Sequence, residues 1–152
     1  MFSKIVVPTD GSELAEKAVD HAIEFCKRLG ASMIAVYVRS PRPVMEVVSF
    51  SDFASHGAQS LTPEMIIERM EGQGRQLVDA VASRARSQGV QCDTVVAVNE
   101  QPYRGIIELA EQQRCSMIFM ASHGRSGIEA LLLGSVTQKV LTHSKVPVLV
   151  FR

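Results

Sequence analysis

The sequence predicts an α/β protein whose core is a parallel sheet, and three observations lead to this expectation. Five short apolar runs have the length of strands, and each is continuous rather than alternating, as expected of strands covered on both faces. Amphipathic helical patterns separate these runs, which favours right-handed parallel crossovers. The length of 152 residues suits one domain, so residues 1–152 are expected to form a single unit.

The strands are placed by the apolar runs themselves. The first covers Ile5 to Val7 and is followed directly by Pro8. The remaining four strands are expected at Met33–Val38, Val95–Val98, Met117–Ala121 and Val146–Phe151. Pro147, in the last of these, lacks an amide hydrogen, so it belongs at the start of a strand or on an edge strand.

Two helices are expected between the first three strands. The first has apolar residues at spacings of three and four from Ala15 to Leu29, with Gly30 as its C-cap. The second begins with Thr62 as N-cap and Pro63 in the first helical position, and it ends at Gly89. Two glycines in its middle, Gly72 and Gly74, each weaken it by about 1 kcal/mol relative to Ala. Its apolar stripe is expected to consist of Ile67, Met70, Leu77, Val78, Val81 and Ala85.

A third helix is expected from Pro102 to about Gln113, and a fourth from near Ser135. The segment from Ser40 to Leu61, by contrast, is polar and irregular and contains three helix breakers. A loop of that length in a compact domain is usually functional or mobile, so we expect a flexible flap there.

The charge balance excludes several classes of function. Sixteen Lys and Arg balance sixteen Asp and Glu, whereas proteins that coat nucleic acid or anionic membranes need clustered positive charge. No apolar run approaches the length of a membrane span, and the N-terminus lacks the pattern of a signal peptide. The three cysteines lie far apart and are odd in number, which suits buried thiols in a reducing compartment. We therefore expect a cytoplasmic protein with no membrane insertion and no nucleic-acid partner.

The first candidate loop, Pro8 to Glu13, follows the first strand. Ligands of open α/β sheets bind at the carboxyl ends of strands, where the strand order reverses. The Asp10 carboxylate is suited to accept hydrogen bonds from a sugar hydroxyl or to hold a metal-bound water. Alternatively, Asp10 or Ser12 caps the following helix, with Glu13 favourable to the helix dipole.

The second candidate loop, Ser122 to Gly127, follows the fourth strand and continues to Gly134 and Ser135. Glycines allow a backbone to approach a ligand closely, and a helix that opens at Gly134–Ser135 offers free amides to an anion. The Ser135 hydroxyl would add a further donor. The alternative is a set of turn glycines followed by an ordinary helix cap.

Known catalytic and phosphate-binding motifs do not occur in the sequence. It contains no GxxxxGK[ST], no GxGxxG after the first strand, no HExxH, no GxSxG and no paired metal-ligand spacing. No nucleophile has an evident partner. His123, the one histidine in a candidate loop, is expected to line that loop rather than to act as a general base. We assign no catalytic residues, and no residues as ligands of a metal ion.

At these two loops the sequence resembles the universal stress protein family, over essentially the whole chain. The resemblance rests on KIVVPTDGS near the N-terminus and on GRSGIEALLLGSVTQKVLTHSKVPVLVF at the other end. The nucleotide-binding branch of the family has the pattern Gly, two residues, Gly, nine residues, Gly, then Ser or Thr. Gly124, the nine residues RSGIEALLL, Gly134 and Ser135 match the later part, and Ala121 replaces the first glycine.

The resemblance implies an open five-stranded parallel sheet in the order 3-2-1-4-5, with helices on both faces, of the adenine-nucleotide α-hydrolase-like type. It also implies that ATP, or alternatively ADP or AMP, lies across the ends of the first and fourth strands. The residues implied to border the adenosine or surround the phosphates are Pro8, Thr9, Asp10, Val38, Met120, Ala121, Gly124, Arg125, Gly134, Ser135 and Val136.

The same resemblance implies a divalent ion, Mg²⁺ or Mn²⁺, held largely by phosphate oxygens. It further implies a homodimer joined through Val146–Phe151, and an apolar edge strand favours such pairing. The expected function is an ATP-binding regulatory module of the stress response, without efficient turnover, that acts on an unknown protein partner. The alternatives are a nucleotide-independent dimeric interaction protein, and a slow ATPase or autophosphorylating protein.

Overall fold

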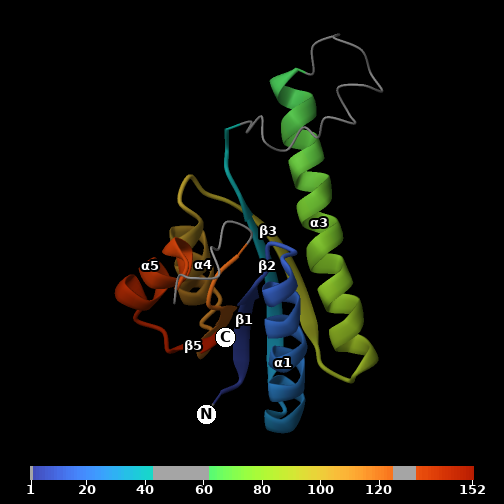
Figure 1. Cartoon of the computed structure of the whole chain (residues 1–152). Coiled ribbons are helices and arrows are strands. Elements are labelled where there is room, and N and C mark those ends of the chain that lie inside the picture. Colours follow the sequence, from blue (N-terminus) through green and yellow to red (C-terminus); the bar gives the residue numbers. More distant parts are fainter. Residues whose placement is uncertain (1, 43–61, 125–132) are drawn as a thin grey trace.

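The computed structural model describes residues 2–42, 62–124 and 133–152, and these form a layered α/β fold around one parallel sheet (Figure 1). The strands stand in the order β3-β2-β1-β4-β5. The predicted fold class and strand order are thereby confirmed. Along the chain the elements are β1 (Lys4–Pro8), α1 (Glu13–Leu29), β2 (Ser32–Arg39), α3 (Pro63–Ser87), β3 (Cys92–Val98), α4 (Pro102–Gln112), β4 (Met117–Ala121), α5 (Ser135–His143) and β5 (Val148–Phe151).

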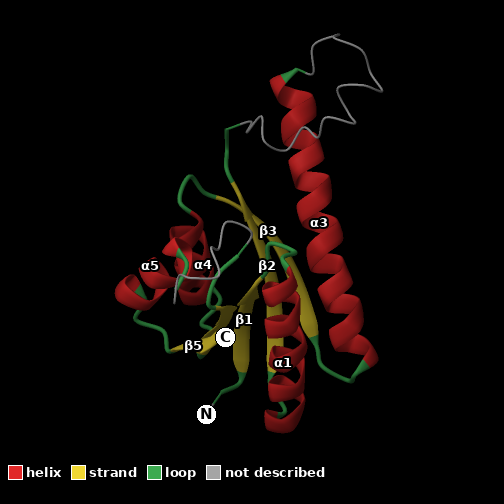
Figure 2. Ribbon diagram, viewed as in Figure 1, coloured by secondary structure: helices red, strands yellow, loops and turns green. Residues whose placement is uncertain are grey.

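The helices cover the two faces of the sheet in pairs (Figure 2). Alternate strand residues such as Ile5 and Phe119 pack with α1 and α3 in one buried cluster. The residues between them, such as Val6 and Ile118, pack with α4 and α5 in a second cluster. Because side chains alternate along a strand, the apolar runs of the central strands supply both clusters at once. The cysteines Cys26, Cys92 and Cys115 are buried in these clusters as free thiols, as the sequence predicts.

The helix ends follow the local signals in the sequence. Ser12 is the N-cap of α1, because its Oγ accepts the Ala15 amide at 3.3 Å. Gly30 ends α1 with a φ of 64°, a left-handed conformation that glycine adopts without strain. Thr62 caps α3, with its Oγ1 accepting the Met65 amide at 3.3 Å, and Pro63 takes the first helical position.

The structure corrects the predicted stripe of α3 and several strand ends. The buried residue near the start of α3 is Ile66, whereas Ile67 and Leu77 are half-buried. Gly74 is also buried in this stripe. The third strand begins at Cys92 rather than Val95, and the last begins at Val148 rather than Val146. The start of β3 is polar and pairs with β2 through its backbone, so a run of apolar residues does not mark it.

The sheet parts in its middle. β1 pairs with β2 along its whole length, but it pairs with β4 only at Ile5–Met117 and Val6–Ile118. Beyond those pairs, the carboxyl ends of β1 and β4 separate, at the point where the strand order reverses. This is the place where open α/β sheets bind ligands. No described helix is long and apolar enough to cross a membrane.

Candidate functional site

A cavity of about 510 Å³ lies where β1 and β4 separate, bounded also by the end of β2 and the starts of α4 and α5. The structure brings ten of the eleven predicted binding residues together in its lining. Arg125, the eleventh, lies outside the described residues. The ten are Pro8, Thr9, Asp10, Val38, Met120, Ala121, Gly124, Gly134, Ser135 and Val136.

The first loop folds around its own side chains. The Asp10 Oδ1 accepts the Ser12 amide at 3.0 Å, and the Thr9 hydroxyl accepts the Gly11 amide at 3.2 Å. Gly11 has a φ of 74°, which places the turn in the left-handed region. The sequence left open whether Asp10 or Ser12 caps α1: the cap is Ser12, and Asp10 holds the turn that precedes it.

Gly124 brings the second loop onto the first. A Cβ at Gly124 would lie 2.2 Å from the Asp10 Oδ2, which is far inside van der Waals contact. The backbone of the second loop therefore lies against the Asp10 carboxylate, and any side chain at Gly124 would displace that carboxylate. This contact joins the two candidate loops across the gap between β1 and β4.

Gly134 provides a second close approach. A Cβ there would lie 3.1 Å from the His123 Cα and 3.2 Å from its Cβ. The Gly134 amide donates to the Ser122 carbonyl at 2.7 Å, which ties the start of α5 to the end of β4. The buried Thr137 hydroxyl reinforces this junction by donating to the Ala121 carbonyl at 2.9 Å.

The N-terminus of α5 opens into the cavity. Gly134 is the N-cap of this nine-residue helix and makes no side-chain hydrogen bond to its first turn. The first three helical residues, Ser135, Val136 and Thr137, all line the cavity. Helix N-termini carry exposed amides and partial positive charge, so this end of the cavity suits an anion.

Another part of the cavity lining is apolar. Val38, Ile106 and Met120 form this wall together with Pro102, whereas the half-buried Tyr37 lines the cavity from β2 and turns its ring towards Gly74 of α3. Lining residues with no motif in the sequence to point to them include Ala15, Val36, Tyr37, Pro102, Ile106, Leu133, Thr137 and Gln138. The position of Pro102 at the start of a helix that follows a strand is the signal that points to it. His123 lines the cavity, as expected, and its Nδ1 lies 3.2 Å from the Ser122 hydroxyl.

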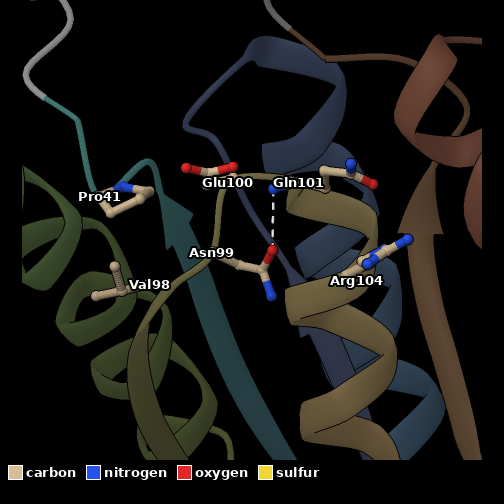
Figure 3. A pocket seen from close by; sticks show the side chains of 6 residues that line it. All are labelled: Pro41, Val98, Asn99, Glu100, Gln101 and Arg104. Atoms are coloured by element: carbon tan, nitrogen blue, oxygen red, sulfur yellow. Dashed lines mark hydrogen bonds between the residues drawn. The ribbon is translucent and has the colours of Figure 1, made fainter.

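A second recess, of about 370 Å³, lies beyond the end of β3 (Figure 3). Its lining comes from Pro41 after β2, from Val98 to Gln101, and from Arg104 on α4. The Asn99 side chain turns back on the chain there and accepts the Gln101 amide at 2.9 Å. Among the described residues, none of those predicted from the sequence to bind a ligand lines this recess.

The described residues contain no group of three or more His, Cys, Asp or Glu side chains placed to hold a metal ion. In the lining of the larger cavity, the described ionisable side chains are Asp10, Tyr37 and His123. The site is therefore built mainly from backbone, glycine and apolar side chains.

Comparison with known proteins gives a consistent result. The model of the universal stress protein family matches residues 1–152. The universal stress protein MJ0531 of Methanocaldococcus jannaschii is 32% identical over 152 residues, which cover 100% of this chain and 83% of the relative. The solved structure of MJ0577 from the same organism has a TM-score of 0.79 at 27% identity, covering 99% of this chain and 95% of that one.

A further solved structure, a universal stress protein in complex with cAMP, has a TM-score of 0.67 at 24% identity. The match covers 99% of this chain and 96% of that one, and at this identity it establishes a shared fold. With the sheet order and the match of the family model along residues 1–152, the chain belongs to the universal stress protein family.

Proposed function

We propose that this protein belongs to the nucleotide-binding branch of its family and binds an adenine nucleotide in the larger cavity. ATP is the first candidate, with ADP and AMP as alternatives. The observation that carries the proposal is the contact of Gly124 with the Asp10 carboxylate, which joins two loops far apart in sequence around one cavity. The cAMP complex of a protein with the same fold supports the ligand class.

The phosphates would lie at the N-terminus of α5. The amides of Ser135 and Val136 and the Ser135 hydroxyl supply donors there without a broad positive field. This arrangement suits a chain whose formal net charge is zero. Arg125, from the same loop, is proposed as a further phosphate partner because its guanidinium donates two hydrogen bonds in one plane.

The adenosine would lie against the apolar wall. Val38, at the end of β2, would offer its backbone to the base, while Met120 and Ala121 would line the same pocket. Pro8 and Thr9 would border the nucleoside, and Asp10 would accept from a ribose hydroxyl. An apolar pocket with a few placed polar groups is the usual form of a small-molecule site.

A divalent ion, Mg²⁺ or Mn²⁺, would be held mainly by the phosphate oxygens of the nucleotide. The backbone donors at the α5 N-terminus fit the phosphates themselves, and the described residues offer no three-ligand cage for the ion. Such ions commonly bind proteins through substrate phosphates and a few carboxylates. When bound, the ion would neutralise part of the phosphate charge.

The experiment is calorimetric titration with ATP and Mg²⁺, with Gly134→Val as the test variant. A side chain at Gly134 displaces the start of α5 from His123, so binding is expected to be lost while the far-ultraviolet spectrum stays unchanged. Gly72→Ala, on the exposed face of α3, is the matched control and should bind as the unmodified protein does. The absence of both a heat signal and a thermal shift at millimolar ATP would contradict the proposal.

We propose a regulatory role without efficient turnover. Asp10 and His123 are the described lining groups suited to acid–base work, and each already contacts a neighbouring group of its own loop. The alternative of slow hydrolysis or autophosphorylation is tested by measuring released phosphate and protein-bound phosphate after incubation with ATP. Release of more than one phosphate per protein chain would overturn the regulatory assignment in favour of an enzyme.

We further propose a homodimer joined through Val146–Phe151. Its β5 portion is the edge of the sheet next to β4, and all four of its residues are half-buried in the single chain. Phe151 stacks against His21 with ring centroids 4.5 Å apart, which connects the edge strand to α1. Equilibrium sedimentation at tens of micromolar should give twice the chain mass.

The alternative of a nucleotide-independent interaction protein makes a different prediction for the purified material. If nucleotide binding is the function, denaturation of freshly purified protein should release an adenine nucleotide, or the empty protein should take one up. A dimer that does neither would favour the interaction protein, whose unknown protein partner would then be the sole ligand.

A further inference from the structure

The Thr9 hydroxyl links the candidate site to the helix layer behind it. Thr9 is buried, with 5% of its surface exposed, and lines the cavity. Its Oγ1 accepts the Gly11 amide at 3.2 Å and donates to the Glu16 Oε1 at 3.5 Å. The second contact is at the long limit for a hydrogen bond between two oxygens, so a small displacement of the Glu16 carboxylate would break it and free the hydroxyl.

Glu16 is itself held from the neighbouring helix. The Arg84 Nη2 on α3 lies 2.5 Å from the Glu16 Oε2, and the Arg84 Nη1 lies 3.2 Å from the Asp20 Oδ1. One guanidinium thus bridges two carboxylates of α1. The planar fork of arginine suits such a bridge, because it directs two donors at once. A lysine would present a single point charge instead.

We infer that Arg84 and Glu16, both outside the cavity, are positioning residues of the nucleotide site. Arg84 fixes Glu16, Glu16 orients the Thr9 hydroxyl, and this hydroxyl holds the Gly11 amide in the turn that presents Asp10. The inference rests on the proposed function for its effect on nucleotide binding. The chain of contacts itself is a property of the ligand-free protein.

Loss of Arg84 would also weaken nucleotide binding through charge. Without Arg84, the Glu16 and Asp20 carboxylates would lose the cation they share, close to a loop proposed to meet a polyanion. Their repulsion of the ligand would rise with ligand charge, whereas the loss of loop geometry would affect adenosine and ATP alike. The two effects can therefore be separated by comparing these ligands.

The first test needs no nucleotide and reads the Gly11 amide by hydrogen exchange in nuclear magnetic resonance. In Arg84→Met this amide should exchange about two- to fivefold faster, the range expected for a partly exposed ion-pair network. Arg75→Met is the matched control, because Arg75 lies on the same helix and pairs with Glu71 of α3. Unchanged exchange at Gly11 in folded Arg84→Met would overturn the inference.

The second test measures nucleotide affinity and separates positioning from general stability. Arg84→Met should weaken ATP binding by about two- to fivefold, and Arg84→Lys should restore part of the loss. In a Thr9→Val background, which lacks the hydroxyl, the effect of Arg84→Met on adenosine binding should disappear. Persistence of the full effect in that background would show that Arg84 does not act through Thr9.

The two proposals fail in different ways. If the unmodified protein binds no nucleotide, the proposed function fails, while Gly11 exchange still decides whether Arg84 positions the loop. If the protein binds ATP and Arg84→Met leaves both the affinity and the Gly11 exchange unchanged, the positioning role alone is wrong. Glu16→Gln, which keeps an oxygen for Thr9 but loses the charge facing Arg84, serves if Arg84→Met fails to fold.

Discussion

Ala121 occupies the position at which the nucleotide-binding pattern has its first glycine. In the structure it is the last residue of β4, and it is absent from the described non-glycine residues with positive φ. Its methyl group packs in the cluster between the sheet and α1. The backbone there has no need of glycine, so the alanine is compatible with the site and contributes to the core.

Replacing Ala121 with glycine should therefore destabilise the protein without improving the site. Loss of a buried methyl group and the greater freedom of the unfolded glycine chain together cost about 1–2 kcal/mol. The free energy of unfolding, measured in urea, should fall by this amount, and the dissociation constant for ATP should stay within twofold. A marked gain in affinity would show that the methyl group obstructs the ligand.

Cys26 gives a prediction about stability at alkaline pH. Burial raises the pKa of this thiol from 9.0 to about 11, with a smaller contribution from the nearby Cys92. The unfolded chain can thus lose the proton at lower pH than the folded protein. The stabilising contribution is complete below pH 9 and is lost as the pH rises towards 11, by about 2 kcal/mol.

The measurement is the free energy of unfolding between pH 8 and 11 for the unmodified protein and for Cys26→Ala. The variant is less stable at pH 8 because it has lost a buried sulfur, but its stability should fall less steeply with pH. Equal slopes for the two proteins would show that the Cys26 thiol ionises as readily in the folded state as in the unfolded one.

At the scale of the element, the two glycines of α3 should respond in opposite ways to alanine. Nothing lies within 4 Å of a Cβ built on Gly72, whereas a Cβ on Gly74 would lie 2.4 Å from the Tyr37 Cδ1. Gly72→Ala should raise the free energy of unfolding by about 1 kcal/mol through helix propensity. Gly74→Ala should lower it by about 1–3 kcal/mol, because the helix must move off the Tyr37 ring.

Thermal and urea unfolding of the two variants in parallel gives this comparison directly. The sequence predicts the same cost for both glycines, because helix propensity treats each residue alone. The difference lies in Tyr37, whose contact with α3 belongs to tertiary packing. If Gly74→Ala were as stabilising as Gly72→Ala, the close packing of α3 on β2 would be wrong.

Local signals predicted the helix starts better than the strand ends. Ser12, Thr62 and Pro63 act within one turn of their own position, so they can be read from the sequence. The polar start of β3 has no comparable local signal. Its residues from Cys92 onward pair with β2 through the backbone, and the register starts at Met33. Pairing between distant segments decides that boundary.

At the scale of the whole molecule, the free edge of β5 provides a test of the proposed dimer. The carbonyls of Pro147 and Phe151 accept the amides of Ile118 in β4 and of Ser122 just after it, so the peptide groups of the odd-numbered residues face β4. Val150 is even-numbered, so its amide points the other way, towards the free edge. Val150→Pro should therefore block strand pairing across the edge and leave the β4 ladder intact.

Equilibrium sedimentation should show Val150→Pro as a monomer under conditions in which the unmodified protein is a dimer. Val150→Thr, which keeps the amide and the branched side chain, is the control and should remain dimeric. A dimer that survives in folded Val150→Pro would place the interface elsewhere on the molecule.

Much of the candidate site followed from the sequence, because the residues proposed to touch phosphate and ribose lie in two short motifs. The rest of the lining did not. Pro102 and Ile106 reach the cavity because α4 packs closely on β2, where a Cβ on Gly105 would lie 2.9 Å from the Val38 Cγ1. Tyr37 lines it from β2 itself, with its ring held against α3. Such an approach between a helix and a strand has no signature in either segment alone.

The parting of β1 from β4 has a mechanical consequence. Two register pairs join the half of the sheet that carries β1, β2 and β3 to the half that carries β4 and β5. A ligand that contacts both loops would connect the two halves at the end where β1 and β4 are not paired. Binding should therefore slow amide exchange at the carboxyl ends of β1 and β4 together, where the backbone ladder between the two halves is missing.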